Sequence, residues 1–127
     1  MDAKNVLINY QNFAVIGVTN NHDKYGYKIF QRLKQLNKTI YGISPIYKDI
    51  DGIATYSSLS EVNKKIDVAV FVVNPQLGIK YVKECQKLKI NHIWLQPGTY
   101  DDKLISIIKD ASITYYPNCI LVESQDI

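Results

Sequence analysis

The sequence predicts an α/β fold in three layers, with helices on both faces of a mostly parallel sheet of five or six strands. Short apolar runs that suit buried strands alternate along the chain with segments of helical periodicity. Such alternation is typical of βαβ units, whose right-handed crossovers make neighbouring strands parallel. The length of 127 residues, with 46% hydrophobic and 21% charged residues, predicts one domain over residues 1–127.

The first strand is predicted at residues 13–16, because an unbroken apolar run suits a strand that is covered on both faces. A short helix over residues 2–10 is expected to precede it and to cover the sheet. Three apolar or aromatic side chains of this helix would face inward: Val6, Leu7 and Tyr10.

A polar loop follows, and Asp23 is the expected N-cap of the next helix. Gly26 lies where this helix meets the sheet, so its missing side chain would allow a close approach. The helix ends at Asn37 and is followed by a strand at residues 39–43. The apolar face of the helix has helical spacing and consists of Gly26, Ile29, Phe30, Leu33 and Leu36.

The middle of the chain begins with a loop-like segment, residues 46–56, with a short edge strand expected around residues 53–56. The segment from Ser58 to Glu61 has the form of a capping box and predicts a short helix. Residues 66–73 form the most strand-like run of the chain. Asn74 and Pro75 then begin a helix, whose inner face would consist of Gly78, Tyr81, Val82, Cys85 and Leu88.

The last third of the chain repeats the pattern. A strand at residues 92–95 leads to a turn, and Asp101 is the expected N-cap of a helix. A final short strand is expected at residues 113–115. The inner face of the last helix would consist of Leu104, Ile105, Ile108 and Ala111.

Composition excludes several classes of function. The net charge is +3, and no dense block of Lys or Arg indicates a nucleic-acid partner. No window approaches the roughly 18 apolar residues that a membrane span requires. Two cysteines, Cys85 and Cys119, do not suggest a disulfide scaffold. A cytoplasmic location is therefore expected.

Function is expected at the carboxyl ends of the strands, since sites in parallel sheets lie there, near the topological switch point. Turn residues follow every predicted strand and would form a rim along this edge. The rim segments are residues 17–24, Ser44-Pro45, Val73-Asn74-Pro75, Gln96-Pro97-Gly98 and Pro117-Asn118-Cys119.

The first rim segment predicts a phosphate site, because a strand, a glycine turn and a helix N-terminus direct free backbone N–H groups at one point. Gly17 matches the first glycine of the G-x-G-x-x-G fingerprint, but Thr19 stands at the second and the next glycine is Gly26. The fingerprint is therefore interrupted, which argues against the usual dinucleotide-binding turn. An ordinary strand–helix connection without a phosphate site remains an alternative. The loop is rich in donors: Thr19, Asn20, Asn21, His22 and Lys24. Tyr25 or Tyr27 beside it could stack on a base.

The second strand ends without the acidic residue that normally binds the ribose hydroxyls of a nicotinamide cofactor. Ser44 and Pro45 stand there, with Lys48 soon after, which suits a nucleotide that carries a phosphate on its ribose. Catalytic residues are sparse. His92 opens a strand, His22 lies in the loop without a nucleophile nearby, and no cluster has metal-ligand spacing.

Six segments in order, AVIGVT, KYGYKIF, YGISP, DVAVFVVNP, IWLQPG and NC, cover the chain from Phe13 to about Glu123. With these segments the chain resembles the small stand-alone CoA-binding domain family. Its members are Rossmann-like proteins similar to the nucleotide-binding domain of the succinyl-CoA synthetase α-subunit. WLQPG and KYGY carry most of the specificity of this resemblance.

The resemblance implies that CoA lies along the carboxyl edge of the sheet. The CoA phosphates would lie at Gly17, Val18 and Thr19, with Lys24 nearby. Ser44 and Pro45 would flank the adenosine part, and Val73, Asn74 and Pro75 would close over it. Gln96, Pro97 and Gly98 would lie towards the pantetheine arm. Family members often have arginine in place of Asn74, and an Asp-Arg pair in place of Pro117-Asn118. Cys119 would be either a buried structural thiol or a rim thiol within reach of the pantetheine thiol.

Three hypotheses follow. The first is a non-catalytic module that binds CoA or acyl-CoA and would handle it for a protein partner. The second is a small NAD(P)-binding enzyme or redox sensor. Serine in place of an acidic residue at position 44 argues against NAD, and the lack of an evident catalytic base argues against an enzyme. The third is a degenerate fold that binds only a protein partner.

Overall fold

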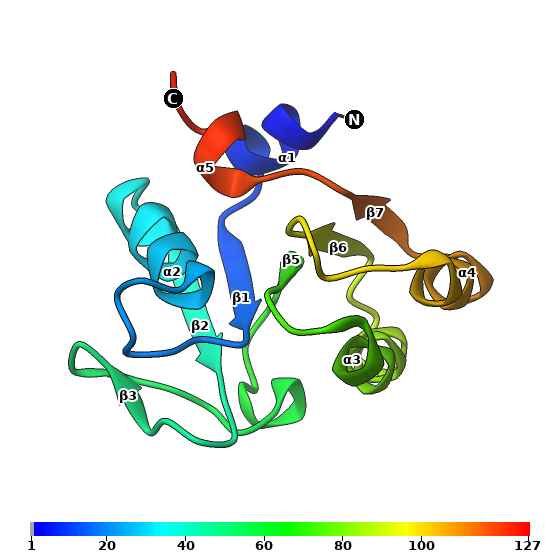
Figure 1. Ribbon diagram of the computed structural model, residues 1–127, viewed down its shortest axis with the longest axis horizontal. Helices are drawn as coiled ribbons and strands as arrows, with labels where there is room; N and C mark the ends of the chain where they lie inside the picture. Colours follow the sequence, from blue (N-terminus) through cyan, green and yellow to red (C-terminus); the bar gives the residue numbers. More distant parts are fainter. Residues whose placement is uncertain (1) are drawn as a thin grey trace.

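The computed structural model describes residues 2–127 and contains a five-stranded, fully parallel sheet between two layers of helices (Figure 1). The strand order is β2-β1-β5-β6-β7. The Rossmann-like three-layer fold expected from the sequence is therefore confirmed, with five strands in the main sheet. These strands are β1 Asn12–Ile16, β2 Thr39–Ile43, β5 Val68–Phe71, β6 His92–Leu95 and β7 Thr114–Tyr116.

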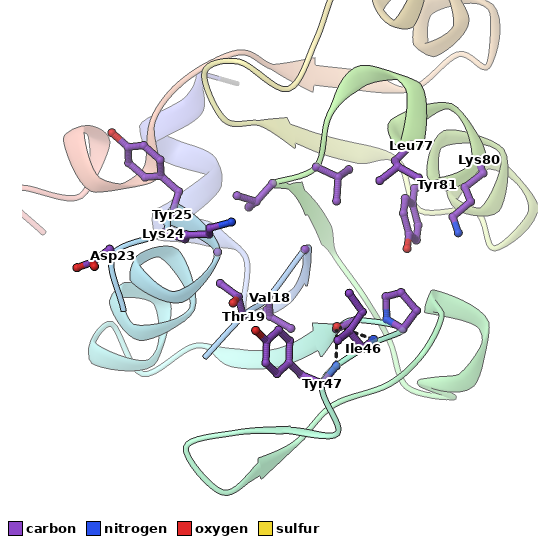
Figure 2. A pocket seen from close by; sticks show the side chains of 16 residues that line it. Val18, Thr19, Asp23, Lys24, Tyr25, Ile46, Tyr47, Leu77, Lys80 and Tyr81 are labelled. Atoms are coloured by element: carbon purple, nitrogen blue, oxygen red, sulfur yellow. Dashed lines mark hydrogen bonds between the residues drawn. The ribbon is translucent and has the colours of Figure 1, made fainter. Parts of the chain in front are cut away.

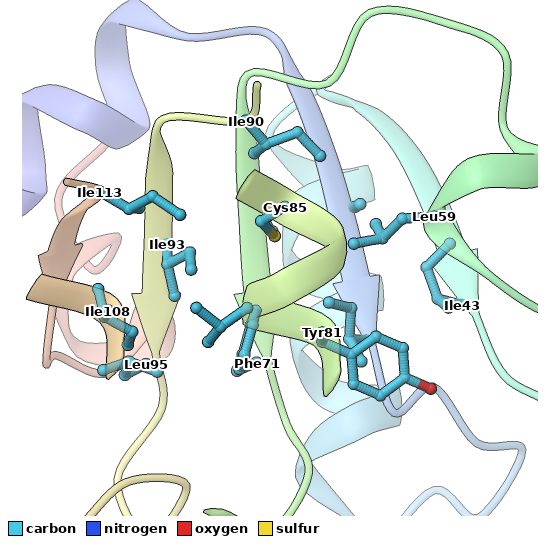
Figure 3. Close-up of a cluster of buried hydrophobic side chains, with 14 of the residues drawn as sticks. Ile43, Leu59, Phe71, Tyr81, Cys85, Ile90, Ile93, Leu95, Ile108 and Ile113 are labelled. Atoms are coloured by element: carbon cyan, nitrogen blue, oxygen red, sulfur yellow. The ribbon is translucent and has the colours of Figure 1, made fainter. Parts of the chain in front are cut away.

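Each face of the sheet is covered by its own set of helices. Helices α1 (Ala3–Asn9), α2 (Tyr25–Gln35) and α5 (Ile120–Glu123) share one hydrophobic cluster with the sheet. Helices α3 (Pro75–Lys87) and α4 (Asp102–Asp110), with the 3₁₀ helix η1 (Leu59–Glu61), share the other. Figure 3 shows part of this second cluster, in which Tyr81 and Cys85 of α3 lie over the central strands.

Alternating side chains of the central strands go to opposite faces. In β1, Phe13 and Val15 pack towards α2, whereas Ala14 and Ile16 pack towards α3. All four are fully buried. A strand covered on both faces has no polar side, which explains why its sequence is an unbroken apolar run.

The strand order places the topological switch point between β1 and β5. After β1 the chain crosses to β2 on one side, and it later returns to β5 on the other side of β1. Ile16 is therefore paired with Ile43 of β2 and with Phe71 of β5. The loops after β1 and β5 lead to helices α2 and α3 on opposite faces of the sheet, which opens a crevice at the carboxyl ends of these strands.

The segment between β2 and η1 forms a small hairpin. Strands β3 (Asp49–Ile50) and β4 (Ile53–Ala54) pair with each other in an antiparallel two-stranded sheet. The short strand expected around residues 53–56 thus exists, but it belongs to this hairpin. Tyr56 alone makes a parallel bridge to Ile43 of the main sheet.

Two helix caps agree with the sequence and two do not. Asn74 and Asp101 accept hydrogen bonds from Leu77 N and Leu104 N, each at 2.8 Å, as expected of N-caps. The N-cap of α2 is Lys24, so the prediction of Asp23 was wrong by one residue. Ser58 makes no side-chain capping bond at η1.

Hydrogen bonds, one local and two long-range, explain both differences. Lys24 N donates to Asn21 O at 3.1 Å, and this turn delays the start of α2 past Asp23. At η1, the carboxylate of Glu84, which reaches over from α3, accepts hydrogen bonds from the backbone N–H groups of Leu59 and Ser60. This long-range cap replaces the local one that the capping box predicts.

The inner faces of the helices agree with the predicted periodicity except at one end. Leu88 is 38% exposed because it is the C-cap of α3, where the backbone leaves the helix. No helix among residues 2–127 combines the length and apolar character that crossing a bilayer would demand.

The C-terminal segment ends in α5, a short helix that the sequence analysis did not identify. Gln96, after β6, holds this segment in place. Its Oε1 accepts hydrogen bonds from Trp94 Nε1 at 3.1 Å and from Ile120 N at 2.8 Å, and its side chain is only 2% exposed. Trp94 Nε1 also donates to Asn118 O at 2.7 Å.

We expect Gln96→Ala to lower the free energy of unfolding by about 1–3 kcal/mol, since it leaves the buried N–H of Ile120 without its acceptor. Chemical denaturation monitored by circular dichroism measures this change. Gln125→Ala, at an exposed glutamine of the same segment, is the matched control and should change stability little. Equal stability of the two variants would show that the Gln96 bonds do not hold the segment.

Candidate nucleotide-binding cleft

A cleft of about 710 Å³ opens at the topological switch point (Figure 2). Three walls surround it: the loop from β1 into α2, the loop after β2, and the end of β5 with the first turns of α3. The lining residues are Gly17, Val18, Thr19, Asp23, Lys24, Tyr25 and Gly26 from the first wall, Ser44, Pro45, Ile46 and Tyr47 from the second, and Val72, Val73, Leu77, Lys80 and Tyr81 from the third.

Gly17 forms the point where the first and third walls meet. Its φ of +100° lies in the region that favours glycine. A Cβ at this position would also lie 2.5 Å from Val72 O, so the two chain segments approach each other too closely for any side chain. The glycine that the sequence analysis chose as the centre of the site is thus required by conformation and by space.

Gly26 brings the N-terminus of α2 against the same point. A Cβ on Gly26 would overlap the carbonyl oxygen of Gly17. The close approach predicted at Gly26 is therefore confirmed. As a result the first turn of α2 lies directly beside the glycine turn.

The N-terminus of α2 is electrostatically open. Lys24 caps it without a side-chain hydrogen bond, and no acidic residue occurs in the first turn. The positive end of the helix dipole and its N–H groups therefore add to the charge of the Lys24 ammonium. Lys80 contributes a second ammonium from the third wall, on the other side of the cleft from Lys24 (Figure 2). Asp23 is the single acidic residue of the lining.

Ser44 shapes the second wall from within. It is buried, and its Oγ accepts hydrogen bonds from Ile46 N at 3.1 Å and Tyr47 N at 3.0 Å. These bonds fold residues 44–47 into a turn that presents Pro45, Ile46 and Tyr47 to the cleft. Ile46 is 80% exposed, an unusual environment for a large aliphatic side chain. Lys48 lies next to this turn, in an adjoining depression that also contains Ser44 and Pro45.

The third wall adds residues that the sequence analysis did not choose as site residues. Leu77, Lys80 and Tyr81 extend the wall from Val73 along α3. Their spacing matches one helix face, but the same spacing is found in any core-facing helix, and Tyr81 was predicted to face the core. Ile46 and Tyr47 were missed in the same way, since nothing in a polar loop marks which side chains turn towards a neighbouring helix.

Some predicted site residues lie outside the cleft lining. Asn74 is occupied as the N-cap of α3, and Pro75 forms its first turn. Pro97 and Gly98 form the turn after β6. Gln96 is directed inward, and its Nε2 donates to Cys119 Sγ at 3.5 Å. The predicted proximity of Gln96, Pro97, Gly98 and Cys119 to a pantetheine arm stays a prediction.

Both histidines and the buried Cys85 lie outside the cleft lining. His22 stacks on Tyr27 with ring centroids 4.0 Å apart, outside the cleft lining. His92 lies at the amino end of β6, and burial lowers its pKa. Burial also raises the pKa of the Cys85 thiol far above its ordinary value. Within residues 2–127 no group of His, Cys, Asp or Glu side chains is arranged to hold a metal ion.

Comparison with known proteins identifies relatives that contain a segment similar in sequence to this chain. The chain is 34% identical to the ADP-forming acetate–CoA ligase of Methanocaldococcus jannaschii over 116 residues, and the alignment covers 84% of this chain. A second ADP-forming acetate–CoA ligase, from Archaeoglobus fulgidus, is 35% identical over 72 residues. The chain spans only 16% and 10% of the lengths of these two ligases.

Solved structures agree in fold. A conserved hypothetical protein from Pyrococcus furiosus is 31% identical with a TM-score of 0.85, and the alignment covers 90% of this chain and 99% of that protein. A hypothetical protein from Pyrococcus horikoshii has a TM-score of 0.90 at 23% identity, covering 96% of this chain and 87% of that protein.

The family comparison covers almost the whole chain. Residues 11–125 match the CoA binding domain, a span that contains all three walls of the cleft. The family resemblance seen in the sequence segments and the cofactor class that it implied, CoA, are thereby confirmed. This chain belongs to the CoA-binding domain family.

Proposed function

We propose that this chain binds CoA or an acyl-CoA in the switch-point cleft and acts as a non-catalytic module. The observation that carries the proposal is the convergence at Gly17: a glycine turn, the open N-terminus of α2 and the Lys24 side chain line one side of a single cleft. Membership in the CoA-binding domain family supports the choice of ligand.

The first wall suits the pyrophosphate. The absence of a Cβ at Gly17 allows β1, the segment after β5 and the start of α2 to meet, and the N–H groups at the start of α2 are ready donors to a phosphate. Lys24 supplies a mobile positive charge, and Lys80 supplies another from the opposite wall. Two ammonium groups and a helix N-terminus favour an anion with several charges over a neutral ligand.

The second wall suits the adenosine part. The turn at residues 44–47 offers the apolar surfaces of Pro45 and Ile46 and the ring of Tyr47, which a planar base can contact. Tyr25, 56% exposed at the start of α2, offers another aromatic surface. No carboxylate stands at Ser44, and Lys48 beside the turn is the proposed partner of the 3′-phosphate.

The third wall suits the pantetheine arm. Val73, Leu77 and Tyr81 make this side of the cleft largely apolar, as the methyl-bearing pantoate unit of CoA would require. From there the arm would extend towards Pro97 and Gly98, with Asn74 and Pro75 at the base of the wall. Cys119 would then lie near the thiol end.

The lining supports binding rather than catalysis. It contains no histidine or cysteine, and Asp23 is its single carboxylate. The two acetate–CoA ligases that resemble this chain are several times longer than it, so we propose that a protein partner in the cytoplasm performs the chemistry and that this module presents CoA to it.

Lys24→Ala is expected to weaken CoA binding roughly 10-fold or more, because a hydrogen bond to a charged group contributes about 1.5–3 kcal/mol. The melting temperature of the unliganded protein should change little, since Lys24 is exposed and its side chain makes no capping bond. Isothermal titration calorimetry measures the affinity. Lys34→Ala, at an exposed lysine in the last turn of α2, is the control for net charge and should bind as the wild type does. Equal affinity of both variants would show that the loop after β1 is only a connection.

The choice of nucleotide gives a further prediction. CoA should bind more tightly than dephospho-CoA, because dephospho-CoA lacks the 3′-phosphate that Lys48 would contact. CoA should also bind more tightly than NAD, because the protein has no carboxylate at position 44 to bind the ribose hydroxyls of NAD. Ser44→Asp should narrow the preference for CoA over NAD, since two like charges a few ångströms apart cost on the order of 1 kcal/mol. An aspartate at position 44 can still accept hydrogen bonds from the backbone N–H groups of Ile46 and Tyr47, so the turn at residues 44–47 should persist.

Ser44→Asn is the matched control, because it offers the same acceptor geometry without the charge and should keep the preference for CoA. Competition binding with the three ligands measures all of these differences. Equal affinities for CoA and dephospho-CoA would remove the role of the ribose phosphate. Tighter binding of NAD would contradict the proposed function and favour a nicotinamide-binding protein.

A further inference from the structure

The loop that forms the first wall of the cleft has little support of its own. Residues 20–25 are all exposed. Within the loop, Asn21 N donates to Thr19 Oγ1 at 3.1 Å and Asp23 N donates to Asn21 Oδ1 at 3.0 Å. These bonds shape the turn, but they do not fix it relative to the rest of the molecule.

The β3–β4 hairpin supplies that connection at two points. Asn20 Nδ2, near the start of the loop, donates to Asp49 O at 2.9 Å. Tyr27, in the first turn of α2, donates its hydroxyl to Asp51 Oδ2 at 2.6 Å, and Gln31 Nε2 donates to the same oxygen at 2.8 Å. The loop therefore lies between two bonds to one hairpin.

The hairpin is itself a firm support. Asp51 and Gly52 form its two-residue turn with φ values of +50° and +82°, a conformation for which Asp-Gly is a preferred pair. Ile50 is fully buried in the cluster beneath α2. At its other end, Thr55 N donates to Lys48 O at 3.0 Å, and Thr55 Oγ1 bonds to Tyr47 O. The hairpin thus joins the first wall of the cleft to the second.

We propose that Asp51 is a positioning residue for the phosphate-binding loop: through its hydrogen bond to Tyr27 it holds residues 20–27 in the conformation that binds CoA. Asp51 is not part of the cleft lining, so it acts through Tyr27 and does not touch the ligand. The inference rests on the proposed function, because it concerns the same cleft.

Two further observations support a role through the hydrogen bond rather than through charge. The Tyr27 phenol is protonated at neutral pH and can donate to Asp51, and the bond to Asp51 raises its pKa further. The Asp51 carboxylate has the same sign as a phosphate, so its charge alone would oppose an anionic ligand. A benefit to binding must therefore come from geometry, since a loop that is already ordered loses less conformational freedom when it binds.

Three variants test this inference: Tyr27→Phe, Asp51→Ala and Asp51→Asn. Tyr27→Phe should weaken CoA binding about 2- to 10-fold, which corresponds to one net hydrogen bond. Asp51→Ala should weaken it at least as much, because it also removes the acceptor of Gln31 Nε2 and places alanine at a φ of +50°. Asp51→Asn should bind within about 2-fold of the wild type, because its amide oxygen still accepts the Tyr27 hydroxyl. The double variant Tyr27→Phe/Asp51→Ala should be no weaker than the weaker single variant, since both changes remove the same bond.

Asp110→Ala, at an exposed acid at the end of α4, is the control for loss of one negative charge and should bind as the wild type does. A purely electrostatic role predicts the opposite pattern, with Asp51→Ala and Asp51→Asn both binding more tightly than the wild type. That pattern, or unchanged affinity in Tyr27→Phe and Asp51→Ala, would overturn the inference while leaving CoA binding itself intact.

Hydrogen exchange of the unliganded protein gives a readout that needs no ligand. The backbone amides of residues 20–24 should exchange faster in Tyr27→Phe and Asp51→Ala than in the wild type and in Asp51→Asn. Unchanged exchange would also overturn the inference. Failure of the wild-type protein to bind CoA would instead contradict the proposed function, and the positioning role with it.

Discussion

The structure depends on the close packing of backbone at Gly17. Here the carboxyl end of β1 meets Val72 after β5, with no room for a Cβ, and Gly26 at the start of α2 meets the Gly17 carbonyl with equally little room. Two residues without side chains thus bring two strands and one helix to a single point. Because the segments after β1 and β5 lead to helices on opposite faces of the sheet, the cleft opens beside this point of close packing.

The burial of the sheet on both faces makes this arrangement rigid. β1 and β5 lie in the middle of five strands, and their side chains fill two separate hydrophobic clusters. The first wall of the cleft is an extension of one cluster and the third wall is an extension of the other. Val18 is part of the cluster beneath α2, whereas Tyr81 belongs to the cluster beneath α3. The distance between the walls is therefore set by packing that involves no ligand.

Features that local chemistry determines could be predicted from the sequence. The strands at Thr39–Ile43 and His92–Leu95 and the caps Asn74 and Asp101 agree with prediction, since each depends on neighbours a few residues away. The N-cap of α2 is an exception among these local features, because the turn at Asn21 moved it from Asp23 to Lys24. Features that depend on distant contacts could not be predicted. The cap of η1 is one of them, because it is provided by Glu84 of α3. The cleft residues Ile46, Leu77 and Lys80 were missed for the same reason, because loop or helix periodicity does not say which partner a side chain meets.

Hydrogen bonding divides the carboxyl edge of the sheet into an open half and a closed half. The loops after β1, β2 and β5 surround the cleft, where the Lys24 and Lys80 ammonium groups and the first N–H groups of α2 remain available to a ligand. The segments after β6 and β7 are instead hydrogen-bonded to the sheet end and to each other. Gln96 Oε1 accepts a hydrogen bond from Ile120 N, and Trp94 Nε1 donates one to Asn118 O. Polar groups that satisfy one another need no ligand for their stability. A long ligand would therefore be anchored at its charged end in the open half, and its other end would meet a preformed surface rather than a second charged site.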